Sequence, residues 1–210
     1  MKTPLLAAAL TFAAAAAALT FGAAPDAAAA ATVGQPAPAF RLVDSTGKPR
    51  SLADFAGKTV VLEWTNHECP FVKKHYGSGN MQAQQRDATA KGVVWLSVNS
   101  SAPGNQGHVD GAAAERVRGQ ARAAQTAYLL DPDGTAGRAY GAKTTPHMYV
   151  IDPKGVLRYA GGIDSVPSPN PADIAKATQY VPQALAELAA GKPVSVSVTR
   201  PYGCSVKYAN

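Results

Sequence analysis

The chain has 210 residues, of which 46% are hydrophobic and 16% are charged, and it contains two cysteines. This is not the composition of a disordered chain, because the apolar fraction is ample and the charged fraction is low. Two cysteines are too few for a disulfide-rich scaffold or a four-cysteine zinc site. The formal net charge of +6 is spread along the chain without a long run of Lys or Arg, so we expect no nucleic-acid partner.

The N-terminus has the pattern of an export signal. Lys2 precedes an apolar stretch over 5–21, Pro25 breaks the pattern, and the alanines at 27–31 offer Ala-x-Ala cleavage positions. We therefore expect residues 1–31 to be a cleaved signal peptide. The mature protein would then be periplasmic or extracellular, with no stable membrane association, in a compartment where disulfides persist. A retained membrane anchor is the alternative.

The remaining chain alternates strand and helix patterns, which is typical of an α/β domain. An alternating segment at 40–43 followed by turn residues predicts an N-terminal hairpin. Apolar or β-branched runs predict strands at 59–64, 93–98, 128–130, 148–151 and 156–160. Helical patterns lie at 51–55, 70–76, 81–90, 108–127, 136–140 and 174–190. The strand–helix–strand order requires a partly parallel sheet, to which the last two strands add an antiparallel hairpin.

We expect one domain over 32–192, followed by a C-terminal tail over 193–210 that carries the second cysteine. The segment 164–171 is rich in Pro and Ser, which indicates a surface loop before the last helix.

The chemistry is expected at Cys69. This residue follows the strand at 59–64 and opens a helix, with Pro70 at the first helical position, where its missing N–H is not needed. The free N–H groups and the positive end of a helix stabilise a thiolate and lower the pKa of a cysteine placed there. We therefore predict that Cys69 is a nucleophile. The alternative is a buried, unreactive thiol.

Three segments of the chain carry a resemblance to a known family. They are Val33–Phe40, which has the pattern Gly-x-x-x-Pro-x-Phe, then Trp64–Tyr76 around the cysteine, and Thr144–Asp152. Together they resemble the thioredoxin-fold redoxins, and more narrowly the peroxiredoxin-like branch of the alkyl hydroperoxide reductase/thiol-specific antioxidant family. The resemblance covers 34–162. It implies a thioredoxin-like α/β fold, with a central mixed sheet, helices on both faces, an N-terminal hairpin and a C-terminal tail.

The resemblance also implies which residues surround the thiol. Pro146 would be a cis-proline against the active cysteine, with an ordinary trans proline as the alternative. Thr145 would offer its backbone to an extended substrate chain. The residues expected to shape the site are Trp64, Asn66, His67, Glu68, Pro70, Thr145, Pro146 and His147. His147 could serve as an acid/base partner of Cys69, and Glu63, if buried near the thiol, as a proton relay.

The chain departs from the family patterns at several positions. Val72 stands where a thioredoxin carries the second cysteine of Cys-x-x-Cys. A peroxidatic peroxiredoxin carries Pro-x-x-x-Thr/Ser-x-x-Cys, and here Leu62 and Asn66 occupy those places. The arginine that peroxiredoxins place near the start of the strand at 148–151 is also missing. Peroxide activation needs donors aimed at the peroxide oxygens, so the sequence puts efficient peroxidase activity in question.

The second thiol, Cys204, lies in a tail segment over 200–208 that resembles the Pro-x-Gly-Cys-Ser tail of the peroxiredoxin-like branch. This implies a resolving cysteine on a mobile arm, which would attack Cys69 once that residue is oxidised or in a mixed disulfide. Three alternatives stay open: a permanent Cys69–Cys204 disulfide, an intermolecular disulfide and a buried free thiol.

The sequence therefore predicts an exported thiol-dependent oxidoreductase that reduces peroxides or exchanges disulfides. Its substrate would be a peroxide or a protein disulfide, an external thiol would reduce it, and no cofactor or metal is expected. The alternative is a non-catalytic module that binds copper or a partner protein in the same cleft. Imidazole and thiolate suit copper or zinc, and the conceivable ligands are His67, Cys69, His75 and His147.

Overall fold

The computed structural model describes residues 31–209 of the protein. Apart from Ala31, the signal peptide expected over 1–31 lies outside the described residues. Among the residues that are described, no helix is long and apolar enough to cross a membrane.

A seven-stranded mixed sheet forms the centre of the molecule, with the order β2-β1-β5-β4-β3-β7-β8. Its strands are β1 (Arg41–Asp44), β2 (Pro49–Ser51), β3 (Val60–Trp64), β4 (Val94–Asn99), β5 (Ala127–Leu130), β7 (His147–Ile151) and β8 (Leu157–Gly161). The three central strands β3, β4 and β5 are parallel, whereas β1, β2, β7 and β8 pair antiparallel with their neighbours. The expected N-terminal hairpin and C-terminal hairpin are both confirmed.

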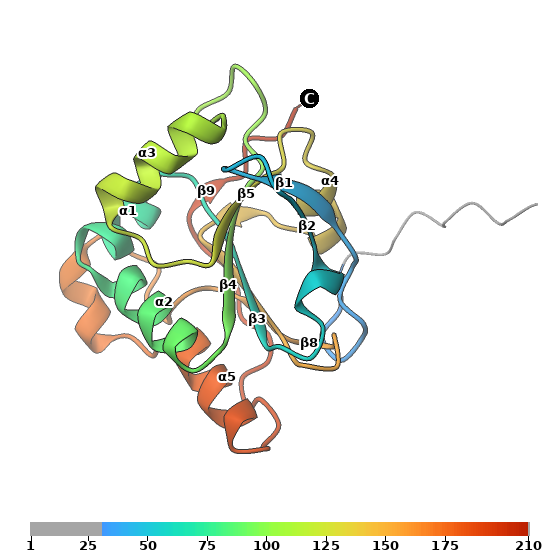
Figure 1. Ribbon diagram of the computed structural model, residues 1–210. Helices are drawn as coiled ribbons and strands as arrows, with labels where there is room; N and C mark the ends of the chain where they lie inside the picture. The colour runs from blue at the N-terminus through green and yellow to red at the C-terminus, as the bar shows by residue number, and fades with distance from the viewer. Residues whose placement is uncertain (1–30, 210) are drawn as a thin grey trace, which may run out of the picture.

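Helices cover both faces of this sheet (Figure 1). They are η1 (Leu52–Phe55), α1 (Pro70–Gly77), α2 (Asn80–Ala90), α3 (Gly111–Ala121), α4 (Thr135–Tyr140), η2 (Pro171–Lys176) and α5 (Tyr180–Ala189). Because side chains alternate along a strand, Leu62 of β3 joins the core on the α4 side, whereas Val61 joins the core formed with α2 and α5.

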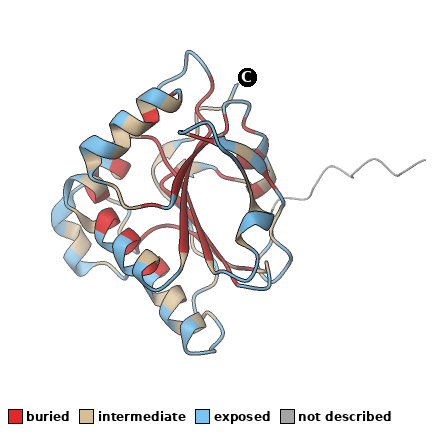
Figure 2. Cartoon of the chain, in the orientation of Figure 1, coloured by how far each residue is buried: buried red, intermediate tan, exposed pale blue. Residues whose placement is uncertain are grey.

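Burial on both faces explains the composition of the central strands, which appear as buried ribbons in Figure 2. Every residue of β3 and β4 is buried. A strand covered on two sides needs a nearly continuous apolar run, and this is what the sequence shows at Val60–Trp64. Full burial of a side chain such as Leu62 contributes about 1.5–3 kcal/mol to stability.

The long helix expected over 108–127 is wrong in its extent, since α3 covers only Gly111–Ala121. It begins late because the Asp110 side chain accepts a hydrogen bond from the Ala113 N–H (2.7 Å) as an N-cap. It ends early because Arg122 adopts the left-handed conformation, with a φ of 50°. The chain is then free to enter β5.

The single helix expected over 174–190 is also wrong. Two pieces replace it, the 3-10 helix η2 and the helix α5. The break at 177–179 arises because the backbone there pairs with the chain after β8: the Ser165 N–H donates to Thr178 O (3.1 Å) and the Tyr180 N–H to Ile163 O (3.2 Å). A tertiary hydrogen-bond pattern therefore overrides the local helical preference.

The tail differs from the mobile arm that its position in the chain suggests. A two-residue strand in it, β9 (Cys204–Ser205), pairs antiparallel with β6 (Thr144–Thr145). The tail is also held at its start, where the Thr199 N–H donates to Ala160 O (3.2 Å), and near its end, where the Tyr208 hydroxyl donates to the Ala142 carbonyl (2.8 Å). Residues 199–208 of the tail are therefore attached to the domain, whereas most residues before them are exposed.

Candidate active site

Cys69 lies at the N-terminus of α1, as predicted. It occupies the N-cap position with an extended backbone, and Pro70 opens the helix. Its carbonyl accepts the first helical hydrogen bond, from the Lys73 N–H (2.9 Å). The side chain has no exposed surface. The thiol thus stands at the positive end of a helix, and it is shielded from solvent.

The loop before β7 and the C-terminal tail, called the arm from here on, cover this thiol. Cys69 Sγ lies 3.2 Å from Thr145 O. The Thr145–Pro146 peptide bond is cis, which confirms the expectation from the sequence. In the β6–β9 pair Thr145 stands opposite Cys204. Both cysteines are free thiols, and they are close enough to hydrogen-bond to each other.

The two thiols have opposite pKa shifts. Burial alone would raise the pKa of Cys69, but hydrogen bonds from the Cys204 thiol and from the backbone N–H groups of Val72 and Cys204 outweigh it, so this pKa is lowered. Burial, the hydrogen bond with Cys69 and the Cys69 charge raise the pKa of Cys204 to about 11. Cys69 is therefore the more acidic of the two thiols and loses its proton before Cys204 does.

Asn66 holds the loop between β3 and α1. Its Oδ1 accepts from the Glu68 N–H (2.9 Å), and its Nδ2 donates to Gln106 O (3.3 Å). A Cβ on Gly107 would lie 2.1 Å from Asn66 Oδ1, so only glycine fits against this side chain. The backbone carbonyl of Asn66 also accepts from the Cys69 N–H (3.0 Å). Asn66 thus fixes the position of the cysteine through the backbone.

The remaining residues expected near the thiol differ in exposure. Glu68 and Pro70 are exposed at the rim of the site. His67 is half-buried, and among the described residues its Nδ1 has no hydrogen-bond partner. Thr145 is buried, and its hydroxyl likewise has no partner in that part of the chain.

Trp64 and His147 support the site from within the core. The Trp64 indole donates to Ser100 Oγ (2.9 Å), and its ring packs against Tyr149 with centroids 5.2 Å apart. His147 Nδ1 lies 3.0 Å from the Tyr149 hydroxyl, and burial lowers the pKa of this imidazole to about 4. No hydrogen bond joins His147 to Cys69 in residues 31–209, so its suggested acid/base role stays a prediction without a contact to support it.

Glu63 is fully buried beneath α1 and α2. Strand alternation turns it to the face opposite Trp64. Its carboxylate accepts hydrogen bonds from Trp95 Nε1 (2.9 Å), the Ser97 hydroxyl (3.0 Å) and the Tyr76 hydroxyl (2.9 Å). Burial raises its pKa in spite of these donors. The suggested proton relay from Glu63 to Cys69 stays a prediction.

Lys74, Asp164 and Tyr202 form a polar cluster that the sequence does not predict. Asp164 was expected in a surface loop, yet its side chain has no exposed surface and lies 3.2 Å from Lys74 Nζ. The prediction of a surface loop over 164–171 is wrong for Asp164, because this residue pairs with a cation inside the protein. The one available signal was the position of Lys74 on α1, where it shares the buried face with His75.

The structure does not bring the conceivable metal ligands together. Within residues 31–209, no group of three or more His, Cys, Asp or Glu side chains is placed to hold a metal ion. His75 instead faces Asn80 and Asp164. Its Nδ1 lies 2.8 Å from Asn80 Nδ2, and its Nε2 lies 3.7 Å from Asp164 Oδ2.

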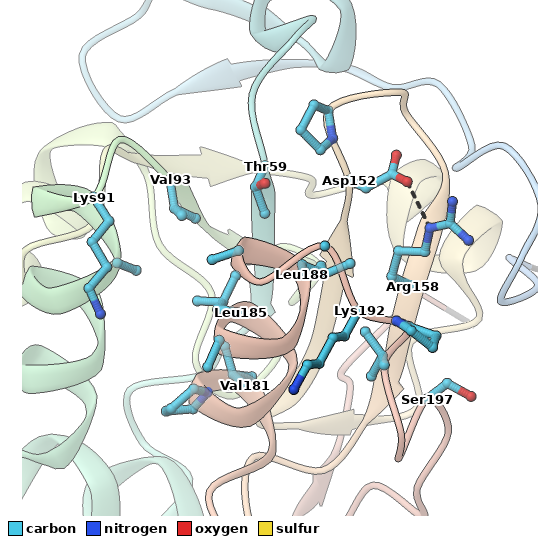
Figure 3. Close-up of a pocket in the computed structure, with 18 of the residues that line it drawn as sticks. Thr59, Lys91, Val93, Asp152, Arg158, Val181, Leu185, Leu188, Lys192 and Ser197 are labelled. Carbon is cyan, nitrogen blue, oxygen red and sulfur yellow. Dashed lines mark hydrogen bonds and ion pairs between the residues drawn. The ribbon is translucent and has the colours of Figure 1, made fainter.

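A cavity of about 830 Å³ lies at the other end of the sheet, beside α5 (Figure 3). Val181, Leu185 and Leu188 line it from α5, and Thr59 lines it from the position just before β3. Cys69 follows the opposite end of that strand. The cavity contains none of the residues expected around the thiol.

A family model and a curated relative match this chain. The model of the AhpC/TSA family matches residues 33–160. The thiol:disulfide interchange protein DsbE of Pseudomonas aeruginosa is 28% identical over 131 residues, which are 61% of this chain and 66% of that protein. The chain thus spans just under two thirds of this relative.

Several solved structures share the architecture. A hypothetical protein of Sinorhizobium meliloti superposes with a TM-score of 0.71 at 22% identity, over 86% of this chain and 97% of the other. An uncharacterized conserved protein of Geobacillus kaustophilus gives 0.72 at 24%, over 85% and 93%. A putative DsbE of Chlorobium tepidum gives 0.52 at 27%, over 62% and 85%. Together with the mixed sheet, they identify the fold as thioredoxin-like.

Proposed function

The chain belongs to the AhpC/TSA family, and we propose that it is an exported thiol-dependent oxidoreductase with Cys69 as nucleophile and Cys204 as resolving thiol. The observation that carries this proposal is the β6–β9 pairing, which sets a second free thiol beside the one at the helix N-terminus. Cys204 would supply the resolving thiol that is missing at Val72, the position of the second cysteine in Cys-x-x-Cys. The export rests on the N-terminal sequence alone.

The first step is attack on a disulfide. The Cys69 thiolate forms a bond with one sulfur of the substrate, the substrate S–S bond breaks, and the other sulfur leaves as a thiolate that takes up a proton from water. The lowered pKa of Cys69 increases the fraction of this thiol that is present as the reactive thiolate. A mixed disulfide between Cys69 and the substrate results.

The second step uses Cys204. Its sulfur attacks Cys69 in the mixed disulfide, the substrate leaves as a thiolate, and that thiolate takes up the proton from Cys204. In the mixed disulfide Cys69 no longer carries the charge that helps to raise the pKa of Cys204, so this proton is lost more easily. The substrate has gained two electrons, and an external dithiol regenerates the pair by reducing the Cys69–Cys204 disulfide.

Burial of Cys69 adds a condition to the first step. While β9 is paired with β6, the Cys69 side chain has no exposed surface. A substrate therefore reaches the thiol only when the arm moves aside. The arm then returns with Cys204 for the second step, as loops and lids do in many enzymes.

Peroxide reduction is the second candidate, and family membership together with the lowered pKa of Cys69 favours it. The thiolate would attack one peroxide oxygen and become a sulfenic acid, while the O–O bond breaks and the alkoxide leaves and takes up a proton from water. Cys204 would then attack the sulfenic sulfur, forming the disulfide with release of water. Among the described residues, no guanidinium hydrogen-bonds to Cys69, so none is in place there to stabilise the leaving oxygen. We therefore expect disulfide exchange to be the faster reaction.

The test compares the two reactions in the purified mature protein. The decay of a disulfide-bonded model peptide and of hydrogen peroxide is followed for the wild type, Cys69→Ser and Cys204→Ser. We expect no reaction with Cys69→Ser, and with Cys204→Ser a mixed disulfide that accumulates and is visible by mass spectrometry. Full activity of Cys69→Ser, or turnover by Cys204→Ser at the wild-type rate, would contradict the assignment.

A further inference from the structure

A fully buried ion pair between Lys74 and Asp164 connects helix α1 to Tyr202, two residues before Cys204 in the C-terminal arm. Lys74 Nζ lies 3.2 Å from Asp164 Oδ2, donates to the Val166 carbonyl (3.3 Å) and lies 3.4 Å from the Tyr202 hydroxyl. The Tyr202 hydroxyl in turn donates to the other oxygen of Asp164. Three segments far apart in the sequence thus meet at a single phenol.

The chemistry of a buried ammonium explains why Tyr202 is part of the network. An ion pair taken out of water is stable only when its remaining donors and acceptors are satisfied. The Lys74 ammonium has three N–H donors, and it meets three oxygens, from Asp164, Val166 and Tyr202. Burial and the neighbouring carboxylate raise the pKa of Tyr202, so its hydroxyl keeps the proton that it donates. The phenol position is therefore fixed from two sides.

Tyr202 also contacts the first turn of α1. Its ring meets Phe71 edge to face, with centroids 5.7 Å apart. Phe71 stands two residues after Cys69, and Tyr202 stands two residues before Cys204. Between them the backbone of Gly203 passes so close to Thr145 that a Cβ would lie 2.0 Å from the Thr145 carbonyl oxygen. The ring and hydroxyl of Tyr202 thus tie together the two segments that carry the thiols.

We propose that Tyr202 is a positioning residue for the resolving thiol: its hydroxyl, held by Lys74 and Asp164, keeps Cys204 beside Cys69. The inference rests on the proposed function and concerns its second step. In that step the Cys204–Cys69 bond forms, the bond from Cys69 to the substrate breaks, and the leaving thiolate takes the Cys204 proton. Tyr202 itself undergoes no chemistry. A fixed arm raises the effective concentration of one thiol at the other, which accelerates closure and favours the closed disulfide.

The test removes the hydroxyl alone. Tyr202→Phe keeps the ring contact with Phe71. Tyr180→Phe is the matched control, because it deletes a phenol oxygen that makes no hydrogen bond within residues 31–209. The equilibrium of the Cys69–Cys204 disulfide with glutathione and the rate of closure from a mixed disulfide are measured. For Tyr202→Phe we expect the equilibrium constant and the rate constant of closure each to fall at least about tenfold, because the hydroxyl loses its hydrogen bonds with two charged groups, Asp164 and Lys74. Tyr180→Phe should leave both unchanged.

The rate of the first step separates positioning of Cys204 from damage to Cys69. It is measured in the Cys204→Ser background with and without Tyr202→Phe. We expect it to stay the same or to rise, since a loosened arm exposes Cys69. A slower first step would overturn the inference, because the hydroxyl would then act on Cys69 itself.

A second variant guards against misfolding of the first. The double replacement Lys74→Met with Asp164→Asn removes both charges together, so no uncompensated charge remains buried. It should lower the equilibrium constant with glutathione in the same direction as Tyr202→Phe. An unchanged constant in every folded variant would overturn the role of Tyr202 while leaving the thiol pair intact. A wild type that never forms the Cys69–Cys204 disulfide would instead overturn the proposed function.

Discussion

At the scale of single residues, the two cysteines form an unequal pair. Cys69 has its pKa lowered by donors that outweigh burial, and Cys204 has its pKa raised by burial and by Cys69. The asymmetry assigns the attacking thiolate to Cys69. The difference between the two pKa values exists only while both thiols are present, because the Cys204 thiol is itself the leading hydrogen-bond donor to Cys69.

Replacing Cys204 by alanine should therefore raise the pKa of Cys69. Loss of the hydrogen bond from the Cys204 thiol removes the main stabilisation of the Cys69 thiolate, while the opposing effect of burial remains. The pH profile of alkylation by iodoacetamide measures this pKa, and its midpoint should move to higher pH in Cys204→Ala. A midpoint that stays in place or moves to lower pH would contradict the described contact.

His147 should make the protein less stable in acid. Burial, and secondarily Lys143, lowers its pKa to about 4 in the folded state from the usual 6.5 of a histidine. The unfolded chain then binds more protons between these two values, so the unfolding free energy falls as the pH drops from 6.5 to 4. The full contribution is about 3–3.5 kcal/mol, since one pKa unit corresponds to about 1.4 kcal/mol.

Urea unfolding at pH 7 and at pH 4.5 measures this effect in the wild type and in His147→Gln. The loss of stability between the two pH values should be smaller in the variant, whatever its stability at pH 7. An equal loss in both proteins would show that His147 does not carry the effect.

At the scale of elements, β9 is the strand on which the second thiol depends. Gly203 precedes it with a φ of 138°, a conformation that side chains rarely adopt, and without room for a Cβ beside the Thr145 carbonyl. Gly203→Ala should therefore detach β9 from β6. We expect faster alkylation of Cys69 and a weaker tendency to form the Cys69–Cys204 disulfide.

Gly119→Ala provides the control for this variant. Gly119 lies within α3, and nothing is within 4 Å of an added Cβ there. This change should leave the thiol chemistry unaffected, and it should stabilise the helix by about 0.8–1 kcal/mol. Equal alkylation rates of Cys69 in Gly203→Ala and the wild type would show that β9 does not shield the thiol.

The elements that the sequence predicts well are those with a strong local pattern. The run Val60–Trp64 and the Cys69–Pro70 helix start are confirmed, because burial on two faces and the chemistry of a helix N-terminus both leave a mark in the sequence. The helix at 108–127 is too long because the left-handed Arg122 has no such mark. The break in the helix at 174–190 depends on pairing with a distant segment.

The candidate site also has parts that the sequence predicts and parts that it does not. The positions of Cys69 and the cis peptide before Pro146 follow from the motifs. The docking of Cys204 does not, because β6 and β9 are two residues long and carry no strand pattern. The cluster of Lys74, Asp164 and Tyr202 is also beyond the sequence, since charged residues are expected at the surface until a partner is known.

At the scale of the whole molecule, the proposed export suits the proposed function, since disulfides form and persist in an oxidising compartment. We expect the mature chain to begin within or just after the alanines at 27–31. N-terminal sequencing of the protein recovered from the periplasm or the medium checks this. Recovery of the chain only from the cytoplasm, with its first residues intact, would contradict the export.

The redox state of the two thiols is the most direct test of the central claim, which is that Cys69 and Cys204 form one reversible pair. The mature protein is equilibrated in glutathione buffers of increasing potential, trapped by alkylation and mapped by mass spectrometry. We predict one transition from two alkylated thiols to a single intramolecular Cys69–Cys204 disulfide, reversed by reduction. Two thiols that stay reduced throughout, or that pair only between molecules, would contradict the account.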